Sequence, residues 1–293
     1  MAYRDYELSQ NAYDRFRVLL EGLCGIVLGG DKQYLVTTRL TPLLNEFGFS
    51  TIDDLLNYIH RDPRPATLHR VVEAMTTKET SWFRDRSPFE LLQRHVLPIV
   101  AKSQPRRLKV WSAACSYGQE THSINIAVEE FLRLNPKQLP EPTILGTDIS
   151  AEAIKSARRG VYTERDLDRG LSPERRKLFF DQVDDGWAVN RQLARRVSFV
   201  RHNLLDDYAS FGHFQIILCR NVLIYFSPET KADILERLAG ALVPGGFLLL
   251  GASEHPGFGS KYFEQITFAG TGVAYRRKSL STVEQASGNT SQS

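Results

Sequence analysis

Short apolar segments alternate with amphipathic ones from residue 108 to residue 251, and this alternation restricts the possible folds more than any other feature of the chain. The apolar segments have the length of buried strands: Leu108–Ser112, Thr143–Asp148, Val197–Val200, Phe214–Cys219 and Phe247–Gly251. The amphipathic segments have the length of helices: Gln119–Leu134, Ala151–Arg159 and Pro228–Leu242. Such a series forms a mostly parallel sheet covered by helices, so the sequence predicts an α/β fold. A last segment, Gly270–Arg276, is expected to pair as an edge strand.

The first 85 residues have the periodicity of helices. Apolar side chains recur three and four residues apart in two sets, namely Phe16, Leu19, Leu20 and Leu23, and Leu68, Val71, Val72 and Met75. This spacing puts an apolar stripe on one helix face. Thr51 with Asp54 resembles a capping box, and Asp31 can cap a helix that Pro42 should kink or break. We therefore expect residues 1–85 to form a small all-helical domain and a linker.

Residues 86–280 then form the α/β domain, but one stretch of it does not fit the alternation. Residues 160–202 carry many charges and only short apolar pieces such as Trp187–Val189. The stretch is too long for a simple loop, so it is expected to form a small inserted subdomain, partly helical and partly antiparallel strand. Residues 281–293 are small and polar and are expected to be a disordered tail.

Charge and cysteine content exclude several classes of protein. The formal net charge of the chain is +3, which is far below that of proteins whose surface binds nucleic-acid phosphates. Cys24, Cys115 and Cys219 are widely spaced and the histidines are scattered, so no metal site is expected. The N-terminus lacks the apolar stretch of a signal peptide, and the apolar runs are too short to span a bilayer. We expect a cytoplasmic protein without membrane insertion.

The first predicted strand runs into a turn of small residues and then into a helix. Residues 110–120 read VWSAACSYGQE, in which Gly118 is the only glycine. Small side chains let a ligand approach the backbone, but the GxGxxG loop that binds a pyrophosphate is absent. Asp148 ends the second strand and can accept hydrogen bonds from two ribose hydroxyls. A tight structural turn and a helix-capping Asp148 remain open as alternatives. Together the two features favour a nucleoside ligand without a pyrophosphate, such as S-adenosylmethionine.

Two later strand ends also carry polar side chains. Asn203 and Leu204 follow one strand, and Arg220 and Asn221 stand between two apolar runs, where a core role does not explain them. Residues 242–247 contain Pro-Gly-Gly, which predicts a helix end and a sharp turn. Ligands of open α/β sheets bind at the carboxyl ends of the strands, so the site is expected there.

Over residues 11–278 the chain resembles the CheR-type chemotaxis receptor glutamate O-methyltransferases. The resemblance rests on TTKETSWFR at 76–84, VWSAACSYGQE at 110–120, TDIS at 147–150, NLL at 203–205, CRNVLIYF at 219–226 and PGGFLLLGASE at 244–254. It implies a Rossmann-like S-adenosylmethionine methyltransferase sheet, joined to the small helical domain and the inserted β subdomain.

The resemblance also implies which residues bind S-adenosylmethionine and its product, S-adenosylhomocysteine. They are Lys78, Thr80, Arg84, Glu120, Asp148, Asn203, Leu204, Asn221 and Val222. Arg84 would pair with the methionyl carboxylate and Asp148 would hold the ribose. Asn203 and Leu204 would border the adenine, Asn221 would lie near the methionine portion, and Glu120 would accept from the ammonium group. The chain departs from the family pattern at Lys78, usually Asn, and at Tyr117, Gln119, Thr121 and His122.

The implied reaction transfers a methyl group to glutamate carboxylates of chemoreceptors. A glutamate side chain is already ionised near neutral pH, so the transfer needs no general base. Tyr225, in preference to Arg220, is expected to orient the acceptor oxygen, and Tyr225 and Arg84 are the predicted catalytic residues. Core packing of Tyr225, with its hydroxyl at the rim, remains open.

The expected partner is the cytoplasmic helical region of a chemoreceptor, bound by a monomer. The family docks through a basic N-terminal domain, whereas residues 1–80 here hold nine Lys or Arg and eleven Asp or Glu. Some members also hold a C-terminal receptor pentapeptide on the inserted subdomain. Here the stretch Phe180–Leu193 is short, with one turn signal at 184–186. We therefore expect that this protein needs no pentapeptide.

Two other functions remain open from the sequence, and a third is disfavoured. The protein could methylate another protein or a small molecule, because the sheet and cofactor residues would look the same. It could be a signalling adaptor that binds S-adenosylmethionine without catalysis, for which Lys78 and Gln119 are the only hints. A nucleic-acid methyltransferase lacks support, since no basic and aromatic recognition region accompanies CRNVLIYF.

Overall fold

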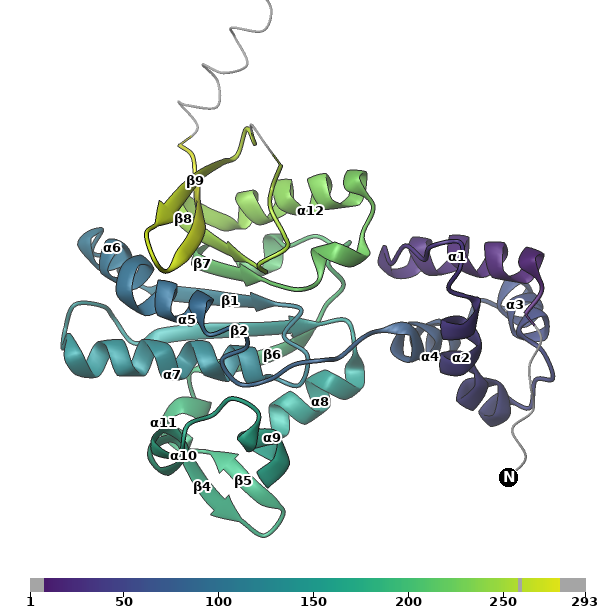
Figure 1. Ribbon diagram of the computed structural model, residues 1–293, viewed down its shortest axis with the longest axis horizontal. Coiled ribbons are helices and arrows are strands. Elements are labelled where there is room, and N and C mark those ends of the chain that lie inside the picture. The colour runs from purple at the N-terminus through teal and green to yellow at the C-terminus, as the bar shows by residue number, and fades with distance from the viewer. Residues whose placement is uncertain (1–7, 258–259, 280–293) are drawn as a thin grey trace, which may run out of the picture. The chain divides into compact units, whose positions relative to one another are not determined.

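The computed structural model describes residues 8–257 and 260–279, which divide into two compact units (Figure 1). The first unit holds the described residues up to Thr77 together with Tyr225–Thr230. The second holds Lys78–Ile224 and the described residues from Lys231 onward. The predicted disordered tail, residues 281–293, lies outside the described residues.

The first unit consists mainly of helices: α1 (Gln10–Cys24), α2 (Gln33–Phe47), α3 (Ile52–Arg61) and α4 (Pro65–Met75). Each helix buries the apolar stripe that its sequence period predicts. Thr51 and Asp54 form the predicted capping box at the start of α3, each side chain accepting from the other residue's backbone N–H.

Helix α2 differs from its prediction at two points. It runs unbroken through Pro42, so the expected break does not occur. Proline removes one backbone hydrogen bond at a cost of about 3 kcal/mol, and burial of Leu40, Leu43 and Leu44 around it offsets that loss. The N-cap is Lys32 and makes no side-chain capping bond, so the predicted cap at Asp31 is wrong.

The second unit contains a seven-stranded sheet with the strand order β6-β2-β1-β7-β8-β10-β9. The strands are β1 (Leu108–Ala113), β2 (Pro142–Asp148), β6 (Val197–Arg201), β7 (Phe214–Cys219), β8 (Leu242–Leu250), β9 (Phe263–Phe268) and β10 (Gly272–Arg277). Strands β6, β2, β1, β7 and β8 pair in parallel, which confirms the α/β prediction. Because parallel strands end at the same edge, the segments after β6, β2, β1 and β7 are neighbours.

The expected edge strand is not at the edge. The segment predicted at Gly270–Arg276 forms β10, which lies between β8 and β9 and pairs antiparallel with both. The edge strand is β9, which the sequence analysis did not identify. Strand β10 buries Ala274 and Tyr275, as an interior strand does. Strand β9 leaves three of its six side chains exposed and has no continuous apolar run to reveal it.

Helices pack against the sheet of the second unit in more than one apolar cluster. The helices are α5 (Ser87–Leu91), a π-helical turn (Leu92–Val96), α6 (Leu97–Lys102), α7 (Gln119–Leu134), α8 (Ala151–Arg159) and α12 (Pro228–Ala241). Val110, Ile216 and Leu249 of the strands pack in one cluster with Ile124 and Val128 of α7. Across the described residues, no helix combines the length and the apolar character needed to cross a membrane.

The inserted subdomain is partly helical and partly antiparallel strand, as predicted. Its small sheet has the order β3-β5-β4 and antiparallel pairing throughout. Its elements are β3 (Val161–Tyr162), α9 (Glu164–Asp168), α10 (Pro173–Phe179), β4 (Phe180–Val183), β5 (Gly186–Val189) and α11 (Arg191–Ala194) (Figure 1). Trp82 packs edge-on against its Tyr162 and Phe180, with ring centroids 4.9 and 5.1 Å apart. The aromatic cluster therefore anchors the segment before α5 to the insert.

Candidate active site

The turn after β1 holds a backbone conformation that side chains disfavour. Ala114, Ser116 and Gly118 have φ angles of 63°, 51° and 92°. Non-glycine residues seldom occupy this left-handed region, and such residues cluster at functional sites. The N–H of Cys115 donates to the carbonyl of Thr147 on β2, at 2.8 Å. The turn is therefore tied to the neighbouring strand.

Asp148, the last residue of β2, joins this turn to α8. Its Oδ2 accepts from the backbone N–H of Ser116 at 2.8 Å, and its Oδ1 accepts from that of Ser150 at 2.9 Å. The N-cap of α8 is Ser150, whose hydroxyl accepts from the N–H of Ala153 at 3.0 Å. Asp148 is thus not the helix cap. A carboxylate beside the turn suits a ligand with hydroxyl groups, which can donate to it.

Glu120 and Arg220 form a buried ion pair at the start of α7. Nη1 of Arg220 lies 2.9 Å from Oε2 of Glu120, and Oε1 of Glu120 accepts from the Ser112 hydroxyl at 2.8 Å. The Arg220 side chain is 0% exposed and also donates to the carboxylate of Asp85 (2.7 Å) and the carbonyl of Arg84 (3.0 Å). Arg220 had been weighed as a donor to the acceptor oxygen. Its guanidinium instead joins α7, the end of β7 and the segment before α5.

The segment before α5, which begins at Lys78, belongs to the second unit and bonds to several parts of it. Trp82 is 1% exposed, and its backbone N–H donates to the carbonyl of Arg169 at 3.0 Å. The carbonyl of Lys78 accepts from the Ser116 hydroxyl at 2.8 Å, so the segment also reaches the turn after β1. Nζ of Lys78 lies 2.7 Å from Oε2 of Glu152. This pair balances the positive charge of Lys78.

Two further predicted residues lie on this segment. Arg84 is half-buried, and its Nη1 donates to the carbonyl of Glu79 at 3.0 Å. Thr80 is half-buried as well. Phe83 and Asp85 flank Arg84 and have φ angles of 48° and 67°. The backbone of this segment is therefore strained in the same left-handed region as the turn after β1.

Asn203 and Leu204 follow β6, next to β2 in the sheet. Oδ1 of Asn203 accepts from the N–H of Leu205 at 3.1 Å, which fixes the side chain against its own turn. Leu204 is buried, and its carbonyl accepts from the hydroxyl of Tyr208 at 2.6 Å. Both residues therefore stand in a rigid turn at the carboxyl edge of the sheet.

Asn221 and Val222 follow β7, and an acid that the sequence analysis missed holds them. Both backbone N–H groups donate to the carboxylate of Glu254, at 2.7 and 2.9 Å. Asn221 has a φ of 57°. The available signal for Glu254 was its place at the end of the PGGFLLLGASE motif, in the turn that follows an apolar strand.

Tyr225 belongs to the other unit, with the helices of residues 8–77. Its carbonyl accepts from the N–H of Val27 at 2.8 Å, and the residue is half-buried. Its catalytic role stays a prediction.

Cys115 and Cys219 are buried and serve as packing residues. Burial raises the pKa of both thiols well above its usual value, and the charges of Asp148 near Cys115 and of Glu254 near Cys219 act in the same direction. Both thiols therefore stay protonated near neutral pH, which excludes them as nucleophiles.

His122 is buried in an aromatic environment. Its ring lies among Trp82, Tyr162 and Phe199, with centroids 5.5–6.4 Å away. Within the described residues neither ring nitrogen has a hydrogen-bond partner, and burial lowers the pKa of His122 to about 4. The imidazole therefore serves as a neutral aromatic ring at physiological pH.

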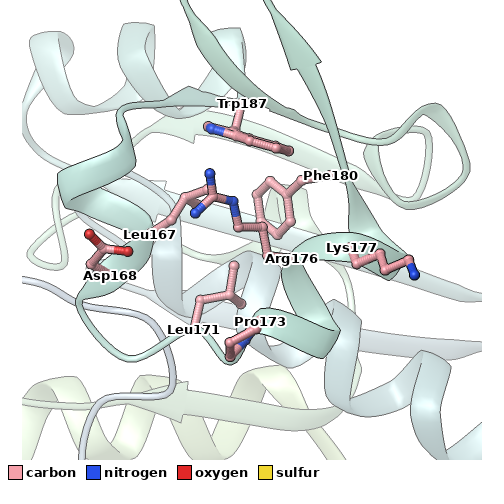
Figure 2. Close-up of a pocket in the computed structure, with 8 residues that line it drawn as sticks. All are labelled: Leu167, Asp168, Leu171, Pro173, Arg176, Lys177, Phe180 and Trp187. Atoms are coloured by element: carbon pink, nitrogen blue, oxygen red, sulfur yellow. The ribbon is translucent and has the colours of Figure 1, made fainter.

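A cavity of about 400 Å³ lies in the inserted subdomain and not at the strand ends (Figure 2). Its lining residues are Leu167, Asp168, Leu171, Pro173, Arg176, Lys177, Phe180 and Trp187. The guanidinium of Arg176 lies over the Trp187 ring, 3.9 Å from its centroid, and both side chains bond to Glu164. None of the predicted cofactor residues lines this cavity. In residues 8–257 and 260–279, no three His, Cys, Asp or Glu side chains are grouped to hold a metal ion.

Comparison with known proteins agrees with this arrangement. Residues 11–76 match the CheR methyltransferase all-alpha domain, and residues 78–269 match the CheR methyltransferase SAM-binding domain. Chemotaxis protein methyltransferase 1 of Pseudomonas aeruginosa is 46% identical over 269 residues, covering 91% of this chain and 97% of the relative. A chemotaxis protein methyltransferase of Vibrio parahaemolyticus is 46% identical over 272 residues, covering 92% and 98%. Chemotaxis protein methyltransferase Cher2 of Pseudomonas putida is 48% identical over 245 residues, covering 83% and 89%. The chain therefore belongs to the CheR family of S-adenosylmethionine-dependent methyltransferases.

Proposed function

We propose that the protein methylates glutamate side-chain carboxylates of bacterial chemoreceptors, giving glutamate methyl esters and S-adenosylhomocysteine. The observation that carries the proposal is that both CheR domains match, over residues 11–76 and 78–269, together with relatives named chemotaxis protein methyltransferases. An acceptor from another class would be expected to bring another recognition module in place of the all-alpha domain.

The cofactor is proposed to bind along the carboxyl ends of β6, β2, β1 and β7, which are consecutive in the sheet. Asp148 would hold the ribose, and Asn203 and Leu204 would border the adenine. Asn221 and Val222 would lie beside the methionine portion. The donor set fits S-adenosylmethionine, because carboxylates accept from hydroxyl and ammonium groups and the turn after β1 shows no pyrophosphate loop.

The methionyl end of the cofactor is proposed also to contact the segment before α5. Arg84 would pair with the methionyl carboxylate, with Thr80 and Lys78 beside it. Glu120 would accept from the ammonium group. Its charge is already shared with Arg220, at 2.9 Å, so the ion pair would orient the carboxylate toward the ligand.

S-adenosylmethionine supplies an electrophilic methyl group on a positively charged sulfur. The residues of this chain then have to align the acceptor and exclude water from its carboxylate. The acceptor glutamate is already ionised near neutral pH, so no side chain has to remove a proton. Tyr225 is proposed to orient the acceptor oxygen, since Arg220 is committed to Glu120 and Asp85.

The protein is proposed to act as a cytoplasmic monomer on the helical region of the receptor, and not on nucleic acid. The first 80 residues hold nine Lys or Arg against eleven Asp or Glu, so docking would not rest on a generally basic helical domain.

The test is a methyl-transfer assay with labelled S-adenosylmethionine and cytoplasmic fragments of several chemoreceptors. Label that enters a receptor and is released as methanol in mild alkali is expected, since carboxylate methyl esters hydrolyse whereas methylamines do not. A receptor fragment with its acceptor glutamates changed to glutamine serves as the control. Alkali-stable label, or equal labelling of the control, would refute glutamate esterification.

A further inference from the structure

Glu254 is a buried carboxylate that collects three backbone hydrogen bonds. Oε2 accepts from the N–H of Asn221 at 2.7 Å and from that of Gly251 at 2.8 Å. Oε1 accepts from the N–H of Val222 at 2.9 Å. Only 8% of the residue is exposed. Hydrogen bonds to an ionised acceptor are about twice as strong as neutral ones, so this carboxylate is a strong local constraint.

The three N–H groups belong to two neighbouring strand ends. Asn221 and Val222 follow β7, Gly251 follows β8, and the two strands pair in parallel. The left-handed conformation of Asn221, with a φ of 57°, persists only where its surroundings hold it. The carboxylate of Glu254 bonds directly to this residue and to the next one.

Gly251 makes the close approach of the carboxylate possible. A Cβ atom at this position would lie 2.5 Å from Oε2 of Glu254 and 3.0 Å from the backbone nitrogen of Asn221. An alanine here would push the carboxylate away from Asn221. Residue 251 therefore has to be small for Glu254 to reach the segment after β7.

We propose that Glu254 is a positioning residue, which holds Asn221 and Val222 in the conformation that binds the cofactor. The inference rests on the proposed function, because it takes these two residues as part of the cofactor site. Glu254 acts through the backbone of Asn221 and Val222. Glu254→Gln keeps the side-chain size but replaces one acceptor oxygen with an NH₂ group, so at least one backbone N–H then faces another donor.

The experiment compares Glu254→Gln with Glu129→Gln in the full chain. Glu129 is also buried, at 5% exposure, and bonds to Arg133 and Arg196 rather than to any predicted cofactor residue. Calorimetric titration with S-adenosylhomocysteine is expected to show about tenfold weaker binding for Glu254→Gln, as loss of one charged hydrogen bond implies. Glu129→Gln is expected to bind like wild type. The ¹⁵N–¹H signals of Asn221, Val222 and Gly251 should move only in Glu254→Gln.

The possible outcomes separate the two proposals. If the wild-type chain binds no S-adenosylhomocysteine, the proposed function is wrong. If the wild type binds and a folded Glu254→Gln binds equally well, or if both variants lose the same affinity, the positioning role is wrong. Should Glu254→Gln fail to fold, Gly251→Ala, which displaces the carboxylate, decides by the same comparison with Glu129→Gln.

Discussion

Arg220 and Glu120 are 100 residues apart in the chain, yet Nη1 of the first lies 2.9 Å from Oε2 of the second. The pair joins the end of β7 to the first turn of α7, and Arg220 extends the link to Asp85. A side chain with 0% exposure cannot exchange these partners for water. The arrangement therefore affects both stability and the shape of the proposed cofactor site.

Replacing Arg220 by methionine should destabilise the protein and weaken cofactor binding. Removing one partner of a buried ion pair costs about 3–5 kcal/mol, because it leaves an uncompensated charge. Arg196→Met is the matched control, since Arg196 is also buried between two carboxylates, Glu129 and Glu141. Urea denaturation should show losses in both variants, whereas calorimetry should show weaker S-adenosylhomocysteine binding in Arg220→Met alone. A folded Arg220→Met with wild-type affinity would contradict this expectation.

Asp148→Ala should weaken S-adenosylhomocysteine binding by about 1–3 kcal/mol, because two hydrogen bonds from ribose hydroxyls to a charged acceptor are lost. Asp166→Ala provides the control, because Asp166 forms a capping box with Thr163 on α9 and is not a predicted cofactor residue. Titration calorimetry measures both variants. If a folded Asp148→Ala variant kept the wild-type affinity, Asp148 would not bind the ribose. Its role would then be structural, through its hydrogen bonds to the backbone of Ser116 and Ser150.

Arg84→Ala should also weaken binding, and Arg84→Lys should recover little of the loss. A guanidinium bonds a carboxylate through two parallel N–H groups, which a lysine ammonium cannot reproduce. Dissociation constants for S-adenosylhomocysteine and for the decarboxylated cofactor, compared across the three proteins, measure this contact. If the substitutions weaken both ligands equally, Arg84 does not bind the methionyl carboxylate.

His122 should make the protein less stable as pH falls toward 5. The unfolded imidazole takes up its proton near pH 6.5, whereas the buried one resists protonation until about pH 4. The unfolded state thus binds more protons between these values, so the free energy of unfolding decreases by about 2 kcal/mol from pH 7 to pH 5. Urea denaturation should show that this decrease in the free energy of unfolding is absent from His122→Phe. Parallel pH dependences of wild type and variant would refute it.

Titration with a synthetic pentapeptide that copies the receptor C-terminus should show no saturable micromolar binding. The edge strand β4 covers only Phe180–Val183, and a very short edge strand disfavours the addition of another strand. Trp187 provides a fluorescence signal, because it is half-buried whereas Trp82 and Trp111 are fully buried. One-site binding, together with loss of methylation when the receptor tail is deleted, would overturn this prediction.

Local patterns in the sequence were sufficient for much of the architecture. The apolar runs at 108–112 and 214–219 predicted strands, and the three- and four-residue spacing predicted the helices of the first unit, because period and length are properties of a short segment. Of the kink or break expected at Pro42, the break does not occur, for the same reason. Local rules count the lost hydrogen bond but not the burial of Leu40 and Leu44 that offsets it.

The family, the α/β class and the strand ends where the site is expected follow from the amino-acid sequence alone, because these depend on segments and motifs of a few residues. The folded chain shows, and local patterns do not, that β9 lies at the edge of the sheet and that Arg220 is bound to Glu120 and Asp85. It also shows that Glu254 holds Asn221. These features join residues 33 or more positions apart, and their partners depend on how the strands are ordered, which no local pattern encodes.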